Sequence, residues 1–438
     1  MPLAIAVGRR VVLLICTLIL VMGTVLCITA ESYEWHLGAR MLIGFSAGQS
    51  EALVPMITQE VFFLHERAKY LMVQQTVQVI LTTIWTLFAS PIAGAITPQG
   101  WYGLGAGLAG LQFFVALFLL PETKYDRNLS AYQEFTRNPN QPGNDIEGSD
   151  SGKPVVLCKH RPALDFVHYQ PRTWKSDMRL WIGKPEWYKA ADVLKVYHSI
   201  RRRQNTANVN IPQQTFELFF FPNVFWALCL NGLTLGVNVA MGTTYGTILT
   251  AAPYNWPDTS ASYVNCGQIV VALIALPLLG TGSDRLIRRY AERNGGVHEP
   301  ETRIIPLVLP IIVGTFTIIL YGQGAAHPDK YHWFVYVWAM SAYYFAFVGA
   351  NIVAITYLLD SYPARAGPLL VIICAFRGFI SFGTSYGTTP FVQSHGYDGA
   401  FGIFGALTAA FGLLGLPIYI WGKRIRQFTG RFAKSKTV

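Results

Sequence analysis

Two charged side chains lie inside one long apolar stretch of the chain, where charges are rare. Arg40 and Glu51 both fall within residues 36–63. A guanidinium within a membrane span costs about 2.5 to 3.5 kcal/mol on insertion scales, so it is normally retained for a pathway or a partner. A carboxyl group in such surroundings can exchange a proton or meet a cationic substrate. We therefore interpret Arg40 and Glu51 as residues that line a pathway or cavity or meet a partner; the alternatives are that Arg40 reaches the outer surface and that Glu51 bonds a neighbouring helix.

The spacing around these two charges places small residues between them. In a helix, Arg40, Gly44, Ala47, Gly48 and Glu51 share one face. That face can pack closely on a neighbour through Gly44 and Gly48, or it can line a wet cavity. At 1.5 Å of rise per residue, Arg40 and Glu51 are about 16 Å apart, so each needs another partner.

Further polar residues lie within apolar stretches of the second half. Asn231 and Asn238 are seven positions apart and share a helix face, so they either line a cavity or join helices through hydrogen bonds. Arg377 lacks so simple an account, and we expect Asp360 to be its partner. The aromatic run 338–347 either stacks on a flat organic cation or packs in the interior. The cavity candidates are Asn231, Asn238, Gln268, Asn351 and Arg377.

Catalytic and metal-binding patterns are missing from the sequence. The nine histidines form no pair with metal-ligand spacing on any apolar stretch, and no G-x-S-x-G segment occurs. The six cysteines show neither metal nor disulfide spacing. The sequence therefore predicts no enzyme activity, no metal and no cofactor.

Composition indicates a membrane protein with many spans. Of 438 residues, 52% are hydrophobic and only 13% are charged. Crossing a bilayer takes about 20 apolar residues in a helix, and such stretches recur ten times, which predicts an all-α fold. They cover residues 11–30, 36–63, 70–96, 101–120, 219–250, 262–282, 304–323, 333–359, 367–392 and 398–422.

Positive charge predicts the orientation of these spans. Sixteen of the 34 Lys and Arg residues lie in the short segments on one side, and the loops on the other side hold only Lys330. Because cytoplasmic loops retain Lys and Arg, both termini are expected in the cytoplasm. The plasma membrane is the expected location. The net charge of +10 then favours anionic inner-leaflet lipid as a partner, and not nucleic acid.

The chain divides into four parts by composition. Residues 1–120 form a bundle of four spans, 121–218 a cytoplasmic central loop that is partly disordered, 219–422 a bundle of six spans, and 423–438 a basic tail. The apolar run after Arg10 is too long for a typical signal peptide, so we expect a retained span. Within the central loop, residues 186–203 either form an amphipathic helix on the inner leaflet or pack on the bundles.

An internal repeat links the two halves. The segment "GTGSDRLIRR" stands before four final spans, and its Arg288-Arg289 aligns with Arg9-Arg10 before four earlier ones. This alignment leaves about sixty residues and two spans without a counterpart in the first half. Carboxylate and guanidinium groups at the cytoplasmic ends of adjacent helices can form ion pairs that close a gate and break when the helices move apart. The alternative is that the basic residues only anchor the chain on the cytoplasmic side. The gate candidates are Gly8, Arg9, Arg10, Gly280, Asp284, Arg285, Arg288, Arg289 and Asp360.

These motifs resemble the major facilitator superfamily. The segment "GTGSDRLIRR" matches its loop motif, of which only "GRR" stands at the amino terminus. The segments "ARMLIGF", "PETKYDR", "PETRIIP" and "YLLDSYP" are similar to its fungal drug:proton-antiporter-like branch of twelve spans, and Ser90-Pro91-x-x-Gly94 partly matches the antiporter motif. The chain thus resembles a major facilitator fold of about ten helices, four plus six, without the first two.

The resemblance implies a secondary active transporter. It would move small organic molecules, such as a drug, a secondary metabolite or an organic cation, together with protons, by alternating access and as a monomer. In this family the arginine of the motif matched by Arg40 and Gly44 is implicated in proton coupling. The alternative is a shortened membrane protein that does not transport, or that needs a partner.

Overall fold

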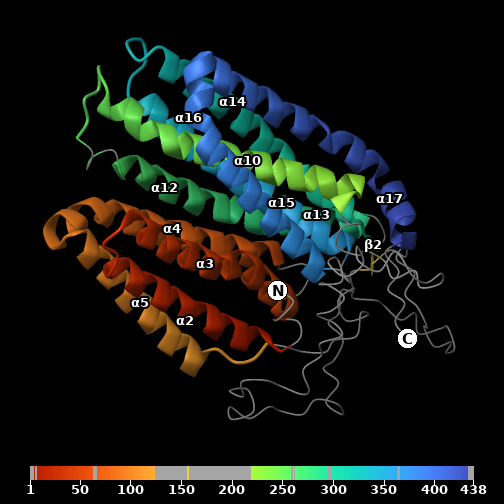
Figure 1. Ribbon diagram of the computed structural model, residues 1–438. Helices are drawn as coiled ribbons and strands as arrows, with labels where there is room; N and C mark the ends of the chain where they lie inside the picture. The colour runs from red at the N-terminus through yellow and green to blue at the C-terminus, as the bar shows by residue number, and fades with distance from the viewer. Residues whose placement is uncertain are drawn as a thin grey trace, which may run out of the picture. The chain divides into compact units, whose positions relative to one another are not determined.

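A computed structural model describes residues 4, 7–62, 67–123, 155–156, 219–257, 260, 262–293, 297–362 and 366–432. The described chain forms two compact units, whose helices are labelled in Figure 1. Of the described residues, the first unit contains those up to Val61 and those between Phe88 and Arg127. The second contains Phe62–Leu87, the residues 155–156 and those from Leu218 onward. The predicted central loop 121–218 lies almost wholly outside the described residues.

Three helices and the end of a fourth build the first unit. They are α2 (Arg9–Ile28), α3 (Tyr33–Val61), α5 (Pro98–Leu119) and the last residues of α4 (Arg67–Ile96). Helix α2 lies against both α3 and α5. A Cβ on Gly23 would stand 2.9 Å from the Ile43 side chain, so glycine allows the close approach of α2 and α3.

The second unit holds the larger core. Helix α15 (Phe334–Ser361) is buried along almost its whole length, and Tyr321, Tyr336 and Tyr343 lie fully inside. Its neighbours in Figure 1 are the long apolar helices around it. They are α10 (Pro222–Thr250), α12 (Cys266–Ala275), α14 (Val308–Ala326) and α16 (Ala366–Leu413).

Shorter elements surround this core. A turn of π-helix, Leu276–Thr281, joins α12 to α13 (Gly282–Arg293), a 3₁₀ segment Pro300–Leu307 leads into α14, and α17 (Gly415–Phe432) ends the described chain. Two-residue strands β1 (Val155–Val156) and β2 (Val297–His298) pair antiparallel.

The apolar stretches fold as predicted into helices. Within the described residues, eight helices are long and apolar enough to cross a membrane, and the fold is all-α apart from the two short strands. Nine of the ten predicted stretches lie in these eight helices, because the last two fall in Leu369–Thr429, where Gly396 interrupts α16 with φ 73°. Helix α3, which carries Arg40 and Glu51, is not among the eight.

Helix starts reveal the register of the internal repeat. Val308 follows Arg9 by 299 positions, and each begins an α-helix. Thr97 and Gly396, also 299 apart, both adopt positive φ at the break before a helix. In this helical register Arg9-Arg10 correspond to Val308-Leu309, and Arg288-Arg289 stand about twenty positions earlier. The first pair opens a long apolar helix, whereas the second belongs to α13, a separate polar helix of 12 residues.

Candidate functional site

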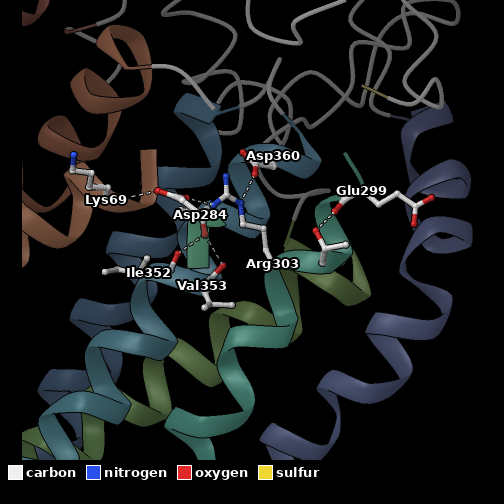
Figure 2. Close-up of polar contacts among 9 residues, drawn as sticks. Lys69, Asp284, Glu299, Arg303, Ile352, Val353 and Asp360 are labelled. Atoms are coloured by element: carbon white, nitrogen blue, oxygen red, sulfur yellow. Dashed lines mark hydrogen bonds and ion pairs between the residues drawn. The ribbon is translucent and has the colours of Figure 1, made fainter. Parts of the chain in front are cut away.

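An arginine flanked by two carboxylates lies at one end of the second unit (Figure 2). Nε of Arg303 donates to Oδ2 of Asp360 at 2.7 Å, and Nη1 of Arg303 donates to Oδ1 of Asp284 at 3.3 Å. The side chains of Arg303 and Asp360 are each 1% exposed and that of Asp284 is 11% exposed. The three residues come from the 3₁₀ segment, α15 and α13. Three elements are thus joined by charge-assisted bonds in a place that largely excludes water.

Asp284 also reaches the beginning of α4. Oδ2 of Asp284 accepts a hydrogen bond from the backbone N–H of Lys69 at 3.1 Å, although 215 positions separate the residues. Lys69 lies in the first turn of α4, where backbone N–H groups lack partners within the helix and favour a negative charge. Gly280 permits this approach, because a Cβ there would stand only 3.3 Å from Met72 and 3.4 Å from the backbone of Lys69.

A second carboxylate stabilises a helix start in the first unit. Glu122 accepts hydrogen bonds from the backbone N–H groups of Arg9 and Arg10, at 3.0 and 3.2 Å. In return, Nη2 of Arg10 donates to the carbonyl of Leu117, in the last turn of α5, at 2.6 Å. The start of α2 and the end of α5 thus stabilise each other, each with the charge that suits its dipole. Gly8 is required beside them, since its φ is 142° and a Cβ would stand 2.5 Å from the Glu122 carboxylate.

The change Glu122→Gln is expected to lower the free energy of unfolding by about 1 to 3 kcal/mol, because it weakens two charge-assisted bonds of a buried group. Thermal unfolding of the purified protein in detergent measures the change. Glu31→Gln is the matched control, since Glu31 is exposed and should shift stability little. Equal effects of the two substitutions would contradict this assignment.

In the second unit a similar link has its charges reversed. Arg426 of α17 donates to Glu301 of the 3₁₀ segment at 3.2 Å, and Lys423 donates to Glu299 at 2.8 Å. The same end holds a neutral network, in which the Tyr362 hydroxyl contacts Asn223 and Thr429. Burial raises the pKa of the Tyr362 phenol, so the group stays protonated and available as a donor. In this link the acidic residues, Glu299 and Glu301, precede α14, and the basic residues, Lys423 and Arg426, lie on α17.

A pair of amides lies deep inside the second unit. Nδ2 of Asn231 on α10 donates to Oδ1 of Asn351 on α15 at 2.9 Å, and both residues are almost fully buried. Within the described residues, the other polar atom of each amide, Oδ1 of Asn231 and Nδ2 of Asn351, has no hydrogen-bond partner. One turn away, the hydroxyl of Tyr343 donates to the carbonyl of Thr234. Unsatisfied buried polar atoms are costly, so this pair calls for an explanation.

The remaining cavity candidates lie apart from this pair. Gln268 on α12 donates to Asn265, which donates to the Tyr245 hydroxyl on α10, at 3.4 and 3.2 Å. Asn238 is half-buried farther along α10, and Arg377 is a buried residue of α16. The aromatic run 338–347 is mostly interior, so its side chains pack within the unit, in agreement with the second of the two interpretations.

The two charged candidates on α3, Arg40 and Glu51, lie at different positions along the helix. Arg40 Nη2 donates to the Tyr102 hydroxyl on α5 at 2.5 Å, and its Nε contacts His36 at 3.4 Å. Glu51 is half-buried eleven positions farther along. A Cβ at Gly44 or Gly48 would meet no described atom within 4 Å, so these glycines do not form a close helix contact in the described structure. Arg40 thus has its partners on α5 and on its own helix.

No group of three or more His, Cys, Asp or Glu side chains lies close enough to hold a metal ion in the part of the chain that the structure describes. The described cysteines are free thiols. Among the described residues, the candidates for a functional site are therefore the charged and amide groups above, and no metal site is a candidate.

Comparison with known proteins decides the family. The sequence profile described as Major Facilitator Superfamily matches residues 1–370. The chain belongs to the Major Facilitator Superfamily. It is therefore a multi-pass membrane protein of a transporter family and not an enzyme, as the resemblance implied.

Individual members of the superfamily extend the similarity to nearly the whole chain. The Schizosaccharomyces pombe protein "Uncharacterized MFS-type transporter C1271.10c" is 25% identical over 98% of this chain and 75% of its own length. "Protein HOL1" of Saccharomyces cerevisiae is 22% identical over 98% of this chain and 78% of its own length. The crystal structure of the human organic anion transporter MFSD10 (TETRAN) superposes with a TM-score of 0.57 at 13% identity, covering 94% of this chain and 79% of that one. That likeness shows the superfamily fold.

The structure corrects two charge assignments in this superfamily chain. Asp360 pairs with Arg303, not with Arg377. The guanidinium beside Asp284 is also that of Arg303, whereas Arg285, Arg288 and Arg289 are exposed on α13, and Arg288 contacts Glu292 of the same helix. Sequence reasoning missed Arg303 as a site residue. The available signal was its position, as a single basic residue between two prolines directly before an apolar helix.

Proposed function

We propose that this chain is a secondary active transporter that couples the movement of a small organic molecule to protons by alternating access. The substrate class is a drug, a secondary metabolite or an organic cation. Membership of a transporter superfamily supports transport as such. The observation that carries the mechanism is the bond from Asp284 to the backbone of Lys69 at the start of α4.

This bond has the properties of a gate contact. It is a single hydrogen bond at a helix end, so breaking it leaves charged and polar groups that water can satisfy. Arg303 holds Asp284 through an ion pair and is itself fixed by Asp360, as Figure 2 shows. Repeated opening can thus separate α4 from α13 while the buried ion pair between Arg303 and Asp360 remains intact.

Two further sets of residues supply the chemistry in this proposal. Arg40 and Glu51, on α3, carry the proton coupling. Asn231 and Asn351 offer one free acceptor and one free donor, which suit a polar group of the substrate. Asn238, Gln268 and Arg377 remain candidates for the same role.

Flux in proteoliposomes tests the proposal. Purified protein is reconstituted, and uptake of radiolabelled tetraethylammonium and of the dye rhodamine 6G is measured with and without a pH gradient. We expect flux of at least one probe that rises with the gradient. Glu51→Gln should lose the response to the gradient, whereas the exposed-site variant Glu34→Gln should keep it. Flux that ignores the gradient, or equal behaviour of the two variants, would overturn proton coupling. No flux of any probe would favour the alternative of a membrane protein that does not transport or that needs a partner.

The amide pair allows transport to be separated from stability. Asn231→Leu alone leaves a buried amide unpaired and is expected to cost about 1 to 3 kcal/mol. Adding Asn351→Leu removes both polar groups, so stability should recover toward the unsubstituted protein. Flux should fall at least tenfold in both variants if the amides bind the substrate. Recovery of flux together with stability in the double variant would show that the pair only joins two helices.

The proposal includes an orientation and a location. Both termini lie in the cytoplasm at the plasma membrane, and the monomer contacts anionic lipid of the inner leaflet. The excess of Lys and Arg in alternate loops supports the orientation, and Lys423 and Arg424 on α17 add exposed basic groups to that side. A tag at either terminus should resist protease added to intact cells and be cleaved after permeabilisation.

A further inference from the structure

A histidine, an arginine and a tyrosine form a closed triangle near the amino-terminal end of α3. Nε of Arg40 lies 3.4 Å from Nε2 of His36, and Nη2 of Arg40 lies 2.5 Å from the Tyr102 hydroxyl. The Tyr102 hydroxyl in turn lies 3.3 Å from Nε2 of His36. The rings of His36 and Tyr102 meet edge to face, with centroids 5.5 Å apart.

The chemistry of these groups determines the proton state that the geometry requires. A guanidinium only donates hydrogen bonds, so Nε2 of His36 must be the acceptor toward Arg40. The imidazole is therefore neutral in this arrangement, with its proton on Nδ1. Once Nε2 binds a proton, it can no longer accept from Arg40, and two cations then face each other. The new N–H can donate to the Tyr102 hydroxyl instead.

We propose that His36 is a proton-operated latch on Arg40. Neutral His36 accepts a hydrogen bond from the Arg40 guanidinium and so holds it. When Nε2 takes a proton from the adjoining solution, this bond is lost, and His36 donates a hydrogen bond to Tyr102 instead. Of these three kinds of side chain, histidine is the one that ordinarily gains or loses a proton between pH 5 and 8. His36 is a positioning residue in this scheme, because it acts through Arg40.

Few other ionisable groups surround the latch. Helix α5 contributes only Tyr102, since no charged residue occurs in Pro98–Leu119. Helix α2 contributes the buried thiol of Cys27. Glu31, Tyr33 and Glu34 lie at the start of α3 and are exposed, so water screens their charges. Among the described residues, Arg40 is therefore the charged group in direct contact with His36.

The latch rests on the proposed role of Arg40 in coupling, yet it can be tested without transport. Full-length protein with ¹³C-labelled histidine is placed in lipid nanodiscs, and ring resonances are followed from pH 5 to 8.5. His36→Gln identifies the His36 signal among the nine histidines. Arg40→Gln should move the midpoint of its titration upward by about half a pH unit or more, because a nearby cation is lost.

A second variant should shift the midpoint in the opposite direction. Tyr102→Phe removes the acceptor of the protonated ring, so the midpoint should fall. The signal of the exposed His395 is the internal control and should stay unchanged in both variants. A midpoint that ignores Arg40→Gln, or two shifts in the same direction, would overturn the latch.

Flux then separates the latch from the proposed function. If both hold, His36→Gln weakens the dependence of flux on external pH. If the opposite midpoint shifts occur but the unsubstituted protein ignores a pH gradient, proton-coupled transport is wrong while the latch stands. If flux follows the gradient but the midpoint shifts are absent, the latch is wrong while proton coupling stands.

Discussion

Replacing Arg303 with methionine is expected to destabilise the protein by about 3 to 5 kcal/mol, because two carboxylates then lose the cation between them. Asp360 keeps a side chain that is 1% exposed and Asp284 one that is 11% exposed. Neither can be hydrated fully without movement of α13 or α15. The same loss frees Asp284 from one of its two described hydrogen-bond partners, so its hold on the first turn of α4 should weaken as well.

Thermal unfolding in detergent measures this effect, and two further variants interpret it. Arg288→Gln is the matched control: its side chain is 71% exposed, and surface pairs contribute less than about 1 kcal/mol. The double variant Arg303→Met with Asp360→Leu removes the buried pair as a unit and should be more stable than Arg303→Met alone. A single variant as stable as the control would show that the pair does not hold these elements together.

Gly349→Ala is the second substitution with a large expected effect, because α14 and α15 touch at that residue. A Cβ on Gly349 would stand 2.5 Å from Cγ and 2.8 Å from Cβ of Pro310. The proline ring is fixed to its backbone and cannot rotate away, so the helices must separate. Overpacking of this kind costs about 1 to 3 kcal/mol.

The matched control for this contact is Gly402→Ala. A Cβ on Gly402 would meet no described atom within 4 Å, and alanine favours a helix over glycine by about 0.5 to 1 kcal/mol. The two alanine variants should therefore shift the unfolding temperature in opposite directions. Shifts of the same sign would mean that the α14–α15 contact tolerates a methyl group.

Sequence patterns predicted the helices well because each depends on consecutive residues. The run after Arg9 folds as α2 within two residues of its expected bounds, since apolar length alone defines such a helix. The polar segment between the last two spans predicted the interruption at Gly396, although the helical ribbon continues through it. Periodicity could not reveal the register of the repeat, because the basic pairs at Arg9 and Arg288 look alike and differ only in the residues after them.

Partners across the fold were much harder to predict. Asp360 and Arg303 are 57 positions apart, and Lys69 and Asp284 are 215 apart, so no local spacing connects them. Both asparagines of the Asn231–Asn351 pair were candidates from their type, yet their contact depends on how α10 lies against α15. His36 and Tyr102 escaped notice because neither residue is unusual in its own segment; only the fold places them beside Arg40.

The opposite polarity of the two end links has a consequence for any attempt to exchange segments between the halves. Grafting the "PET" segment that follows α5 onto the end of α17 would bring a new carboxylate toward Glu301, in place of Arg426. Two acids would then repel at a helix junction that needs a base. The duplicated halves have therefore diverged into parts that fit only their own positions, and a chimera would have to carry both ends of a link together.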